Sequence, residues 1–229
     1  MMAIKAGINP KKIVFSGVGK TFDEIKYAIN KNIFLINAES ESEIKQIEKI
    51  AKLKKKKIQI GIRLNPNIDA KTLSQISTGK KENKFGVNSK TFIKLINNYK
   101  NSKNIDLKCL SVHIGSQILD HKPYEKMLNS ISKILKKIKY RFEFIDLGGG
   151  MGISYDNKQK SLDYKPYQKM INVLDKLIRK IDFNFEYIDL GGGMGIDYNK
   201  NNKKFNYKKY NQIIKKFLKK HTSKIIFEP

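Results

Sequence analysis

The stretch Ile145-Asp146-Leu147-Gly148-Gly149-Gly150-Met151-Gly152-Ile153 occurs a second time, residue for residue, from Ile188 to Ile196. An apolar run that ends in Asp and is followed by three glycines is typical of a buried strand that stops at a tight turn. Glycines carry no Cβ, so the backbone N–H groups of such a turn stay accessible to an anion. The turn therefore suits a phosphate group, although a strand-to-helix turn that needs glycine only for its geometry explains the same residues.

The repeat extends well beyond the glycines. Residues 119–155 and 162–198 align without a gap at a spacing of 43 residues, and 23 of the 37 aligned positions are identical. This pattern indicates a tandem duplication of one helix-plus-strand unit. Two copies of one strand would compete for the same neighbours in a closed barrel. We therefore expect either that the copies occupy consecutive places in an altered sheet or that one copy is displaced.

Short β-type runs alternate with amphipathic helical patterns along the whole chain. The predicted strands are Ile13–Ser16, Ile33–Asn37, Ile58–Leu64, Leu107–Ile114, Phe142–Leu147, Phe185–Leu190 and Lys224–Phe227. The predicted helices are Thr21–Asn30, Ser40–Leu53, Thr91–Tyr99, Lys122–Ile138, Lys165–Ile181 and Tyr207–Lys220, and the first two begin with a capping-box pattern. This alternation predicts right-handed βαβ units and a parallel sheet, and hence an α/β fold.

The predicted strand ends are polar or glycine-rich. They are Ser16–Thr21, Asn37–Ser40, Arg63–Pro66, His113–Gln117, the two glycine turns and Glu228–Pro229. Ligands of parallel α/β folds bind at the carboxyl ends of the strands. The convergence of these residues at one edge favours a site for a phosphate-bearing ligand over a set of purely structural turns.

The composition is that of a basic globular protein. The chain has 229 residues, of which 40% are hydrophobic, and a formal net charge of +26. Such a charge is compatible with nucleic-acid binding. However, only three of the 47 basic residues are arginines, the residue favoured for bidentate recognition of bases and phosphates. The lysines are scattered along helix faces, so we interpret them as solvated surface and expect no nucleic-acid partner.

Cysteine usage and hydropathy bear on the cellular compartment. The single cysteine, Cys109, rules out an internal disulfide and lies between apolar neighbours in a predicted strand. Met1 to Gly7 contains no apolar segment of a secretory signal, and no stretch reaches the roughly 18 apolar residues of a membrane span. These features predict a soluble, cytoplasmic protein.

Several motifs together resemble the diaminopimelate decarboxylases. They are Ile13–Thr21, Arg63–Pro66, Ser77–Gly86, His113–Gln117, Asp189–Gly193 and Glu228–Pro229, and they occur in the family's order. Ser77–Gly86 and His113–Gln117 are the most specific, because they distinguish this family from the related ornithine and arginine decarboxylases.

The resemblance implies a fold type III enzyme dependent on pyridoxal phosphate. It implies an alanine-racemase-like (β/α)8 barrel, here a partial one, with the N-terminal units and the C-terminal β-domain missing and one helix-strand unit duplicated. Residues 1–229 would form a single incomplete domain. The implied reaction is the decarboxylation of meso-diaminopimelate to L-lysine and carbon dioxide, in lysine biosynthesis. A completed enzyme would be a homodimer with a small amino-acid substrate.

The resemblance also assigns roles to individual residues. His113 would stack on the pyridine ring, Ser116 would help to hold the cofactor near its phosphate, and Glu228 would bond the ring nitrogen. The phosphate would lie against Gly191, Gly192 and Gly193, or alternatively against the first copy, Gly148, Gly149 and Gly150. The second copy is preferred because it lies about 35 residues before Glu228, which suits the family's spacing. No metal ligands are expected.

The chain also departs from the family pattern. The family's Schiff-base lysine precedes any motif matched here, and neither Lys5 nor Lys20 lies in that motif. Its cysteine proton donor belongs to the missing C-terminal domain, so Cys109 is not that residue. We therefore predict no catalytic residue within this chain and expect it to be inactive alone. Two alternatives stay open: a non-catalytic module that binds pyridoxal phosphate or phosphate, and a basic nucleic-acid-associated protein.

Overall fold

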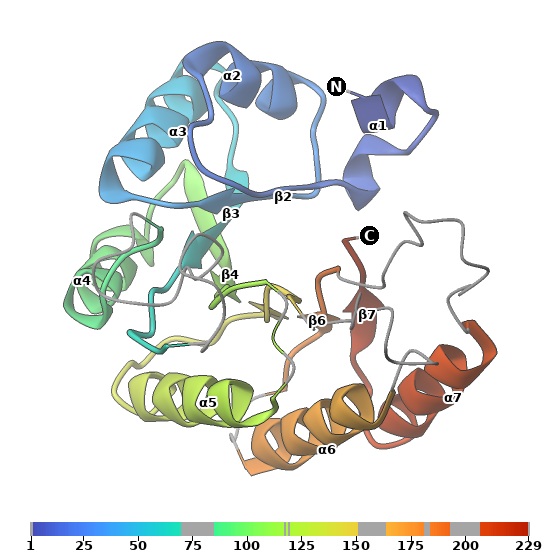
Figure 1. Ribbon diagram of the computed structural model, residues 1–229. Coiled ribbons are helices and arrows are strands. Elements are labelled where there is room, and N and C mark those ends of the chain that lie inside the picture. The colour runs from blue at the N-terminus through green and yellow to red at the C-terminus, as the bar shows by residue number, and fades with distance from the viewer. Residues whose placement is uncertain are drawn as a thin grey trace. The chain divides into compact units, whose positions relative to one another are not determined.

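A computed structural model describes residues 2–69, 85–116, 118, 120–150, 164–180, 184–192 and 207–228, with only the backbone at residues 164–167, 170, 177 and 180 (Figure 1). The chain divides into two compact units. Unit 1 comprises Met1–Asn65 and Lys84–Val112, and unit 2 comprises Pro66–Asn83 and His113–Pro229. Each unit is a parallel α/β structure. The predicted motif Ser77–Gly86 lies almost entirely outside the described residues.

Unit 1 contains four parallel strands in the order β1-β2-β3-β4. They are β1 (Val14–Phe15), β2 (Leu35–Ala38), β3 (Ile58–Arg63) and β4 (Ile105–Ser111). Its helices are α1 (Met2–Lys5), α2 (Phe22–Asn30), α3 (Glu41–Leu53) and α4 (Ser89–Tyr99), with a 3-10 turn at Pro10–Lys12. The core is formed mainly by isoleucines and leucines of the strands and of one face of each long helix, among them Ile25, Ile44, Ile47, Ile60, Ile62, Leu95 and Ile96.

The first turns of α2 and α3 are capped by their own side chains. Thr21 Oγ1 accepts the Glu24 N–H, and the Glu24 carboxylate accepts the Thr21 N–H at 2.8 Å, which completes the predicted capping box. At α3, Ser40 Oγ accepts the Glu43 N–H at 3.2 Å, but the carboxylate of Glu43 accepts the Glu39 N–H instead of returning to Ser40. The second capping box is therefore only half formed, because Glu43 also pairs with Lys20.

The described part of unit 2 contains three parallel strands in the order β5-β6-β7. They are β5 (Phe144–Asp146), β6 (Tyr187–Asp189) and β7 (Lys224–Ile226), and the helices are α5 (Lys122–Leu135), α6 (Tyr164–Lys180) and α7 (Tyr207–Leu218). Apolar side chains of these elements are buried together, among them Met127, Leu128, Ile131, Ile171, Leu174, Ile188, Ile214 and Phe217. All seven predicted strands and six predicted helices are confirmed, with ends that shift by a few residues.

The two copies of the repeat form consecutive strands. Phe144 pairs with Tyr187, Ile145 with Ile188 and Asp146 with Asp189. Each pair is separated by the 43 residues of the repeat, so the copies lie side by side in the register that the duplication itself defines. The first of the two arrangements expected from the sequence is therefore observed, and neither strand is displaced.

A buried carboxylate joins α6 to the end of α7. Asp175 on α6 accepts hydrogen bonds from Arg179 at 2.9 and 3.0 Å and from Lys220 at 2.8 Å, and its Oδ1 lies 3.1 Å from His221 Nε2. Burial raises the pKa of Asp175, but these hydrogen bonds outweigh it, so the pKa lies below its ordinary value. The interaction fixes the last helix of unit 2 against the second copy.

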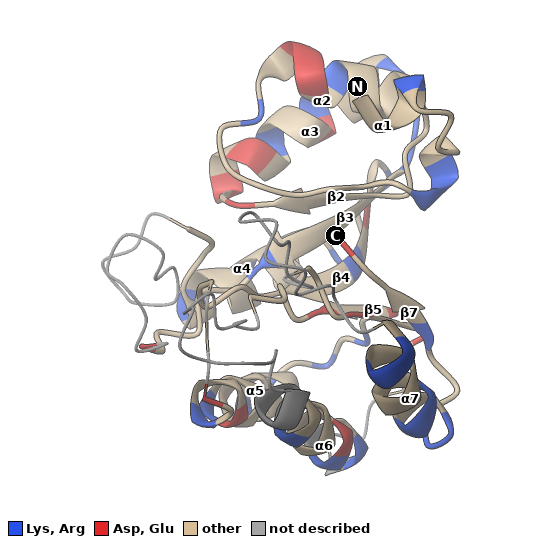
Figure 2. Cartoon of the chain, turned by 45° about the vertical axis from the view of Figure 1, so that its right-hand side comes forward, with Lys and Arg blue, Asp and Glu red and all other residues tan. Residues whose placement is uncertain are grey.

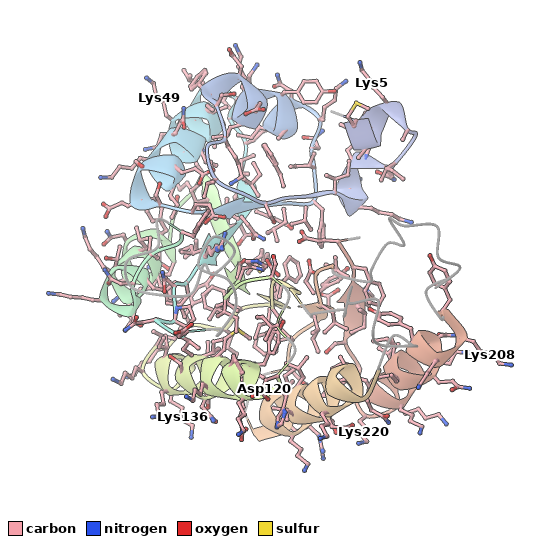
Figure 3. The ribbon with its side chains drawn as sticks, in the orientation of Figure 1. Lys5, Lys49, Asp120, Lys136, Lys208 and Lys220 are labelled. Atoms are coloured by element: carbon pink, nitrogen blue, oxygen red, sulfur yellow. The ribbon has the colours of Figure 1, made fainter. Side chains whose placement is uncertain are left out.

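Lysines cover the outer faces of the helices in both units (Figure 2). The labelled Lys5, Lys49, Lys136 and Lys208 point away from the ribbon, whereas Lys220 is bonded to Asp175 (Figure 3). This distribution agrees with the interpretation of the lysines as solvated surface. Among the described residues, no helix combines the length and the apolar character that a membrane crossing requires.

Candidate functional site

The two glycine turns have the same local structure, including the hydrogen bond made by the aspartate that precedes each of them. Gly148, Gly149 and Gly150 follow β5 with φ angles of 68°, 60° and 77°, and Gly191 follows β6 with φ 65°. These left-handed conformations disfavour residues with a Cβ. In the first copy Asp146 Oδ1 accepts the Gly148 N–H at 2.8 Å, and in the second Asp189 Oδ1 accepts the Gly191 N–H at 2.7 Å. The first amide of each turn is thus bound by the chain's own carboxylate.

The two turns pack directly against one another. A Cβ added to Gly149 would lie 2.6 Å from Gly192 N, and a Cβ added to Gly191 would overlap the backbone of Gly149. Real Cβ atoms essentially never approach other atoms so closely. The glycines at these positions are therefore required by the contact between the copies, independently of any ligand.

The first turn is held by residues that precede it in unit 2. His113 Nδ1 forms a short hydrogen bond with Gly148 O, and the buried Tyr124 donates its hydroxyl to Gly149 O at 2.7 Å. The Ile118 N–H donates to Gly150 O at 2.9 Å. All three carbonyls of the first turn accept hydrogen bonds from within the unit. Burial raises the pKa of the Tyr124 hydroxyl, so it remains a donor at every relevant pH.

The second turn is bonded to the end of β7 and to the residues that follow it. The Glu228 N–H donates to Gly191 O at 3.0 Å, and the Leu190 N–H donates to Ile226 O at 3.0 Å. These backbone bonds fix the half-buried Glu228 beside the second turn.

Three carboxylates meet where β5, β6 and β7 end. Oxygens of Asp146, Asp189 and Glu228 all lie within 4.8 Å of one another, and the two aspartates are 4% and 3% exposed. Burial, together with the negative charges of Asp146 and Glu228, raises the pKa of Asp189 to about 8. The cluster therefore holds at least one proton at neutral pH. Such an oxygen set is also of the type that binds hard cations such as Mg²⁺, whereas no metal ligands were expected from the sequence.

Polar residues at the strand ends of unit 1 form a separate network. Lys20 Nζ donates to Gly17 O at 2.5 Å, to Asn37 O at 2.7 Å and to Glu43 Oε1 at 2.8 Å. Its side chain is only 2% exposed, so the amine is fully engaged in internal contacts. Arg63 Nη1 donates to Glu39 Oε1 at 2.8 Å.

Comparison with known families identifies the class of this fold. The family described as pyridoxal-dependent decarboxylase, pyridoxal binding domain, matches residues 1–181 and again residues 164–229. The chain belongs to this family. The second match begins at the start of α6, so the two matches overlap in the duplicated unit, which is the repeat already seen in the sequence.

Relatives within the decarboxylase family are similar over part of their length. The diaminopimelate decarboxylase of Helicobacter pylori strain J99 is 47% identical over 160 residues, which cover 69% of this chain and 40% of that protein. The enzyme of the same name from Campylobacter jejuni is 42% identical over the same shares of the two chains. The chain thus spans about 40% of the length of these curated relatives.

Solved structures agree with the sequence relatives. The crystal structure of the Helicobacter pylori diaminopimelate decarboxylase with L-lysine has a TM-score of 0.64 at 36% identity and covers 99% of this chain and 47% of that one. The M. jannaschii enzyme, also with L-lysine, has a TM-score of 0.67 at 32% identity, covering 80% and 44%. The predicted fold class, part of a pyridoxal-phosphate (β/α)8 barrel, is therefore correct.

The described residues of unit 2 offer groups of the kind that the pyridoxal phosphate implied by the family requires. Glu228 would supply a carboxylate to accept the proton of a ring nitrogen, and His113 would supply an aromatic face. The glycine turns present backbone without Cβ atoms. In the second turn the Gly191 N–H is already bound by Asp189, and the half-buried Gly192 follows it. Lys20 is not available as a covalent anchor, because its amine has three acceptors.

The structure places most of the predicted site residues in unit 2. His113 contacts the first turn and Glu228 the second, while Ser116 is half-buried three residues after His113. Gly193 and Gln117 lie outside the described residues. Sequence reasoning missed Asp146, Asp189 and Tyr124 as parts of the site. The aspartates carried a signal, since each stands two residues before its glycines in both copies.

Proposed function

We propose that this chain forms the cofactor-binding part of a diaminopimelate decarboxylase, the class of enzyme that removes one carboxylate from meso-diaminopimelate to give L-lysine and carbon dioxide. The observation that carries the proposal is the position of Glu228, whose backbone is bonded to Gly191 O at 3.0 Å in a chain that belongs to the pyridoxal-dependent decarboxylases. The named relatives at 47% and 42% identity support the choice of substrate.

The proposed roles follow from the chemistry of each group. Glu228 accepts the proton of the ring nitrogen and keeps it in place. Gly191, Gly192 and Gly193 bring the backbone close to the phosphate, and Gly148, Gly149 and Gly150 are the alternative copy. His113 faces the ring, and Ser116 offers a hydroxyl near the phosphate. When bound, the cofactor supplies an electron sink for the charge left by the departing carboxylate.

We expect the chain by itself to bind the cofactor without catalysing the reaction. None of its motifs matches the family's Schiff-base lysine or cysteine proton donor, and covalent catalysis requires such an anchor. We further propose a small amino-acid substrate, a homodimer and a cytoplasmic location, with no nucleic-acid partner.

The test is a binding titration with pyridoxine 5′-phosphate, which lacks the aldehyde and cannot react with the many surface lysines. The wild-type chain and the Glu228→Gln variant are compared by isothermal calorimetry at pH 7.5. We expect saturable binding that weakens at least tenfold in the variant, because a charge-assisted hydrogen bond contributes about 1.5–3 kcal/mol. Lys208→Gln on α7 serves as a matched surface control. Absence of binding to the wild type would refute the proposed function.

The alternative, a module for phosphate alone, is favoured by the glycine turns themselves. It predicts that inorganic phosphate binds as tightly as the pyridoxine ester and that Glu228→Gln has no effect. The same titration therefore separates the two.

A further inference from the structure

An open groove of about 540 Å³ lies within unit 1, near the N-terminal ends of β2 and β3. This is the opposite end of the strands from the polar strand ends at which the sequence predicted a site. Pockets for small molecules have volumes of about 300–1,000 Å³ and mostly apolar walls. The groove has that size, and its wall is largely apolar, formed by Ala28, Ile29, Ile33, Phe34, Ile36 and Ile58.

The groove follows from the way in which α2 and α3 end. Asn32 after α2 has a φ of 52° and Lys55 after α3 has a φ of 50°, so both connections turn through a left-handed residue shortly before the next strand. Such a residue ends a helix and redirects the chain. The residue after the second turn, Lys56, reaches back to the end of α2, where its Nζ donates to Asn32 Oδ1 at 2.6 Å and to Ile29 O at 3.2 Å.

The ammonium group of Lys56 has a charge that these two bonds do not neutralise, because both acceptors are uncharged. An ammonium group has three N–H donors, so one donor of Lys56 has no protein acceptor among the described residues. The two bonds hold the half-buried side chain in place beside the groove. The third donor is therefore available to a ligand without further ordering of the side chain.

Two further lysines add positive charge to the groove. Lys11 and Lys57 are exposed and line it together with Lys56. Lys57 forms one long ion pair, at 4.0 Å, with Asp106, and Lys11 forms none with any residue that the structure describes. No acidic residue is among the described residues that line the groove. An apolar wall bordered by three ammonium groups is complementary to a ligand with an anionic head and an apolar body.

We propose that this groove binds a small amphiphilic carboxylate, with the carboxylate on Lys56 and the apolar chain against Phe34 and Ile58. Lys56 donates a charge-assisted hydrogen bond to the ligand, and Lys11 and Lys57 attract the anion through their charge. The groove lies entirely in unit 1, whereas the glycine turns belong to unit 2. It is therefore a second binding site, separate from the proposed cofactor site.

The test is a titration of the full chain with sodium octanoate, followed by the amide chemical shifts of isotope-labelled protein. We expect saturable binding with a Kd below about 1 mM. The shifts should change at Ile33, Phe34 and Ile58 and stay constant in β5, β6 and β7. Acetate, which lacks the apolar chain, and octanol, which lacks the charge, should each bind about tenfold more weakly or not at all.

Three variants locate the site. Lys56→Met keeps the aliphatic stem and removes the charge, so octanoate should bind about tenfold more weakly. Lys56 also bonds to the end of α2, so the double variant Lys11→Met/Lys57→Met, with two exposed side chains, gives a second readout: affinity should fall about threefold while the unfolding midpoint stays constant. Lys49→Met is the matched control, because Lys49 on α3 points away from the ribbon, and it should change the affinity by less than about twofold (Figure 3).

An equal loss of affinity in Lys49→Met and Lys56→Met would indicate unspecific attraction of the anion to a basic chain, and it would overturn the inference. So would equal affinity for octanol and octanoate, the absence of saturable binding, or an unchanged affinity in the double variant. None of these results bears on the proposed function, because pyridoxine 5′-phosphate is titrated separately and Lys56→Met should leave that titration unchanged.

Discussion

Replacement of Asp189 by Asn should stabilise the protein at neutral and alkaline pH. The pKa of this buried carboxyl is raised from 3.8 to about 8 by burial and by the charges of Asp146 and Glu228. The folded state therefore binds more protons than the unfolded state between these pH values. The free energy of unfolding falls as pH rises through this window, by up to about 1.4 kcal/mol per pH unit. At pH 7 the raised pKa of Asp189 therefore lowers the free energy of unfolding by roughly 4 kcal/mol relative to its value at pH below 3.8.

The Asn side chain cannot ionise, so this decrease in the free energy of unfolding with pH is absent from the variant, and the hydrogen bond to Gly191 is retained. Its Oδ1 can still accept the Gly191 N–H that Asp189 accepts at 2.7 Å. We expect Asp189→Asn to be more stable than the wild type by a few kcal/mol at pH 8, and the difference to shrink as pH falls and to vanish only well below 3.8, where the aspartate is protonated in both states. Urea unfolding followed by circular dichroism at pH 5, 6, 7 and 8 measures this difference. EDTA at constant ionic strength excludes a bound cation as the cause.

Asp175→Asn is the matched control, because it changes another buried aspartate of the same unit whose pKa is lowered. Burial acts to raise that pKa, but the hydrogen bonds from Lys220 and Arg179 outweigh it. This variant should be less stable than the wild type by about 1–3 kcal/mol across pH 5 to 8. The reasoning would be refuted if the Asp189→Asn difference were flat over this range, or if Asp189→Asn were the less stable protein at pH 8.

Three further substitutions test the packing around the site and in unit 1. Gly149→Ala places a Cβ 2.6 Å from Gly192 N at a φ of 60°, and chemical unfolding should show a loss of about 2–3 kcal/mol; an unchanged midpoint would argue against the contact between the turns. Tyr124→Phe leaves the buried Gly149 O without its hydroxyl donor and should cost about 1–3 kcal/mol, with Tyr207→Phe on the surface as a silent control. Thr21→Ala removes the cap of α2 and should lower the thermal midpoint through a loss of about 1 kcal/mol, whereas Thr21→Ser should preserve it.

The secondary structure was accessible from sequence because most of it depends on local periodicity. The apolar runs around Ile58–Arg63 and Ile105–Ser111 and the capping pattern at Thr21 indicate strands and a helix start without knowledge of their neighbours. The short helix Met2–Lys5 was missed, because four residues without a buried side chain leave no periodic signal. At Ser40 only one of the two hydrogen bonds of the predicted capping box forms, because the carboxylate of Glu43 binds the Glu39 N–H and the distant Lys20 instead.

The site was only partly predictable, for a related reason. The positions of the two turns could be predicted from sequence, because the same three glycines follow an apolar run in both copies. The choice between adjacent and displaced copies depends on strand pairing, however, and both copies have the same local preferences. The meeting of Asp146, Asp189 and Glu228 follows from that pairing, so the carboxylate cluster could not be inferred before the register was known.

The pairing of β5 with β6 makes the repeat unit complementary to itself. One edge of the first copy pairs with the opposite edge of the second, in the register of the repeat, so the contact is head-to-tail. The array ends where the helix of the last copy meets Lys220 and His221 through Asp175, a contact that the first copy cannot make because it has Ser132 at that position. The duplication therefore lengthens the sheet by one strand through a contact of the kind that repeat arrays use, and the contact of Asp175 with Lys220 and His221 marks its end.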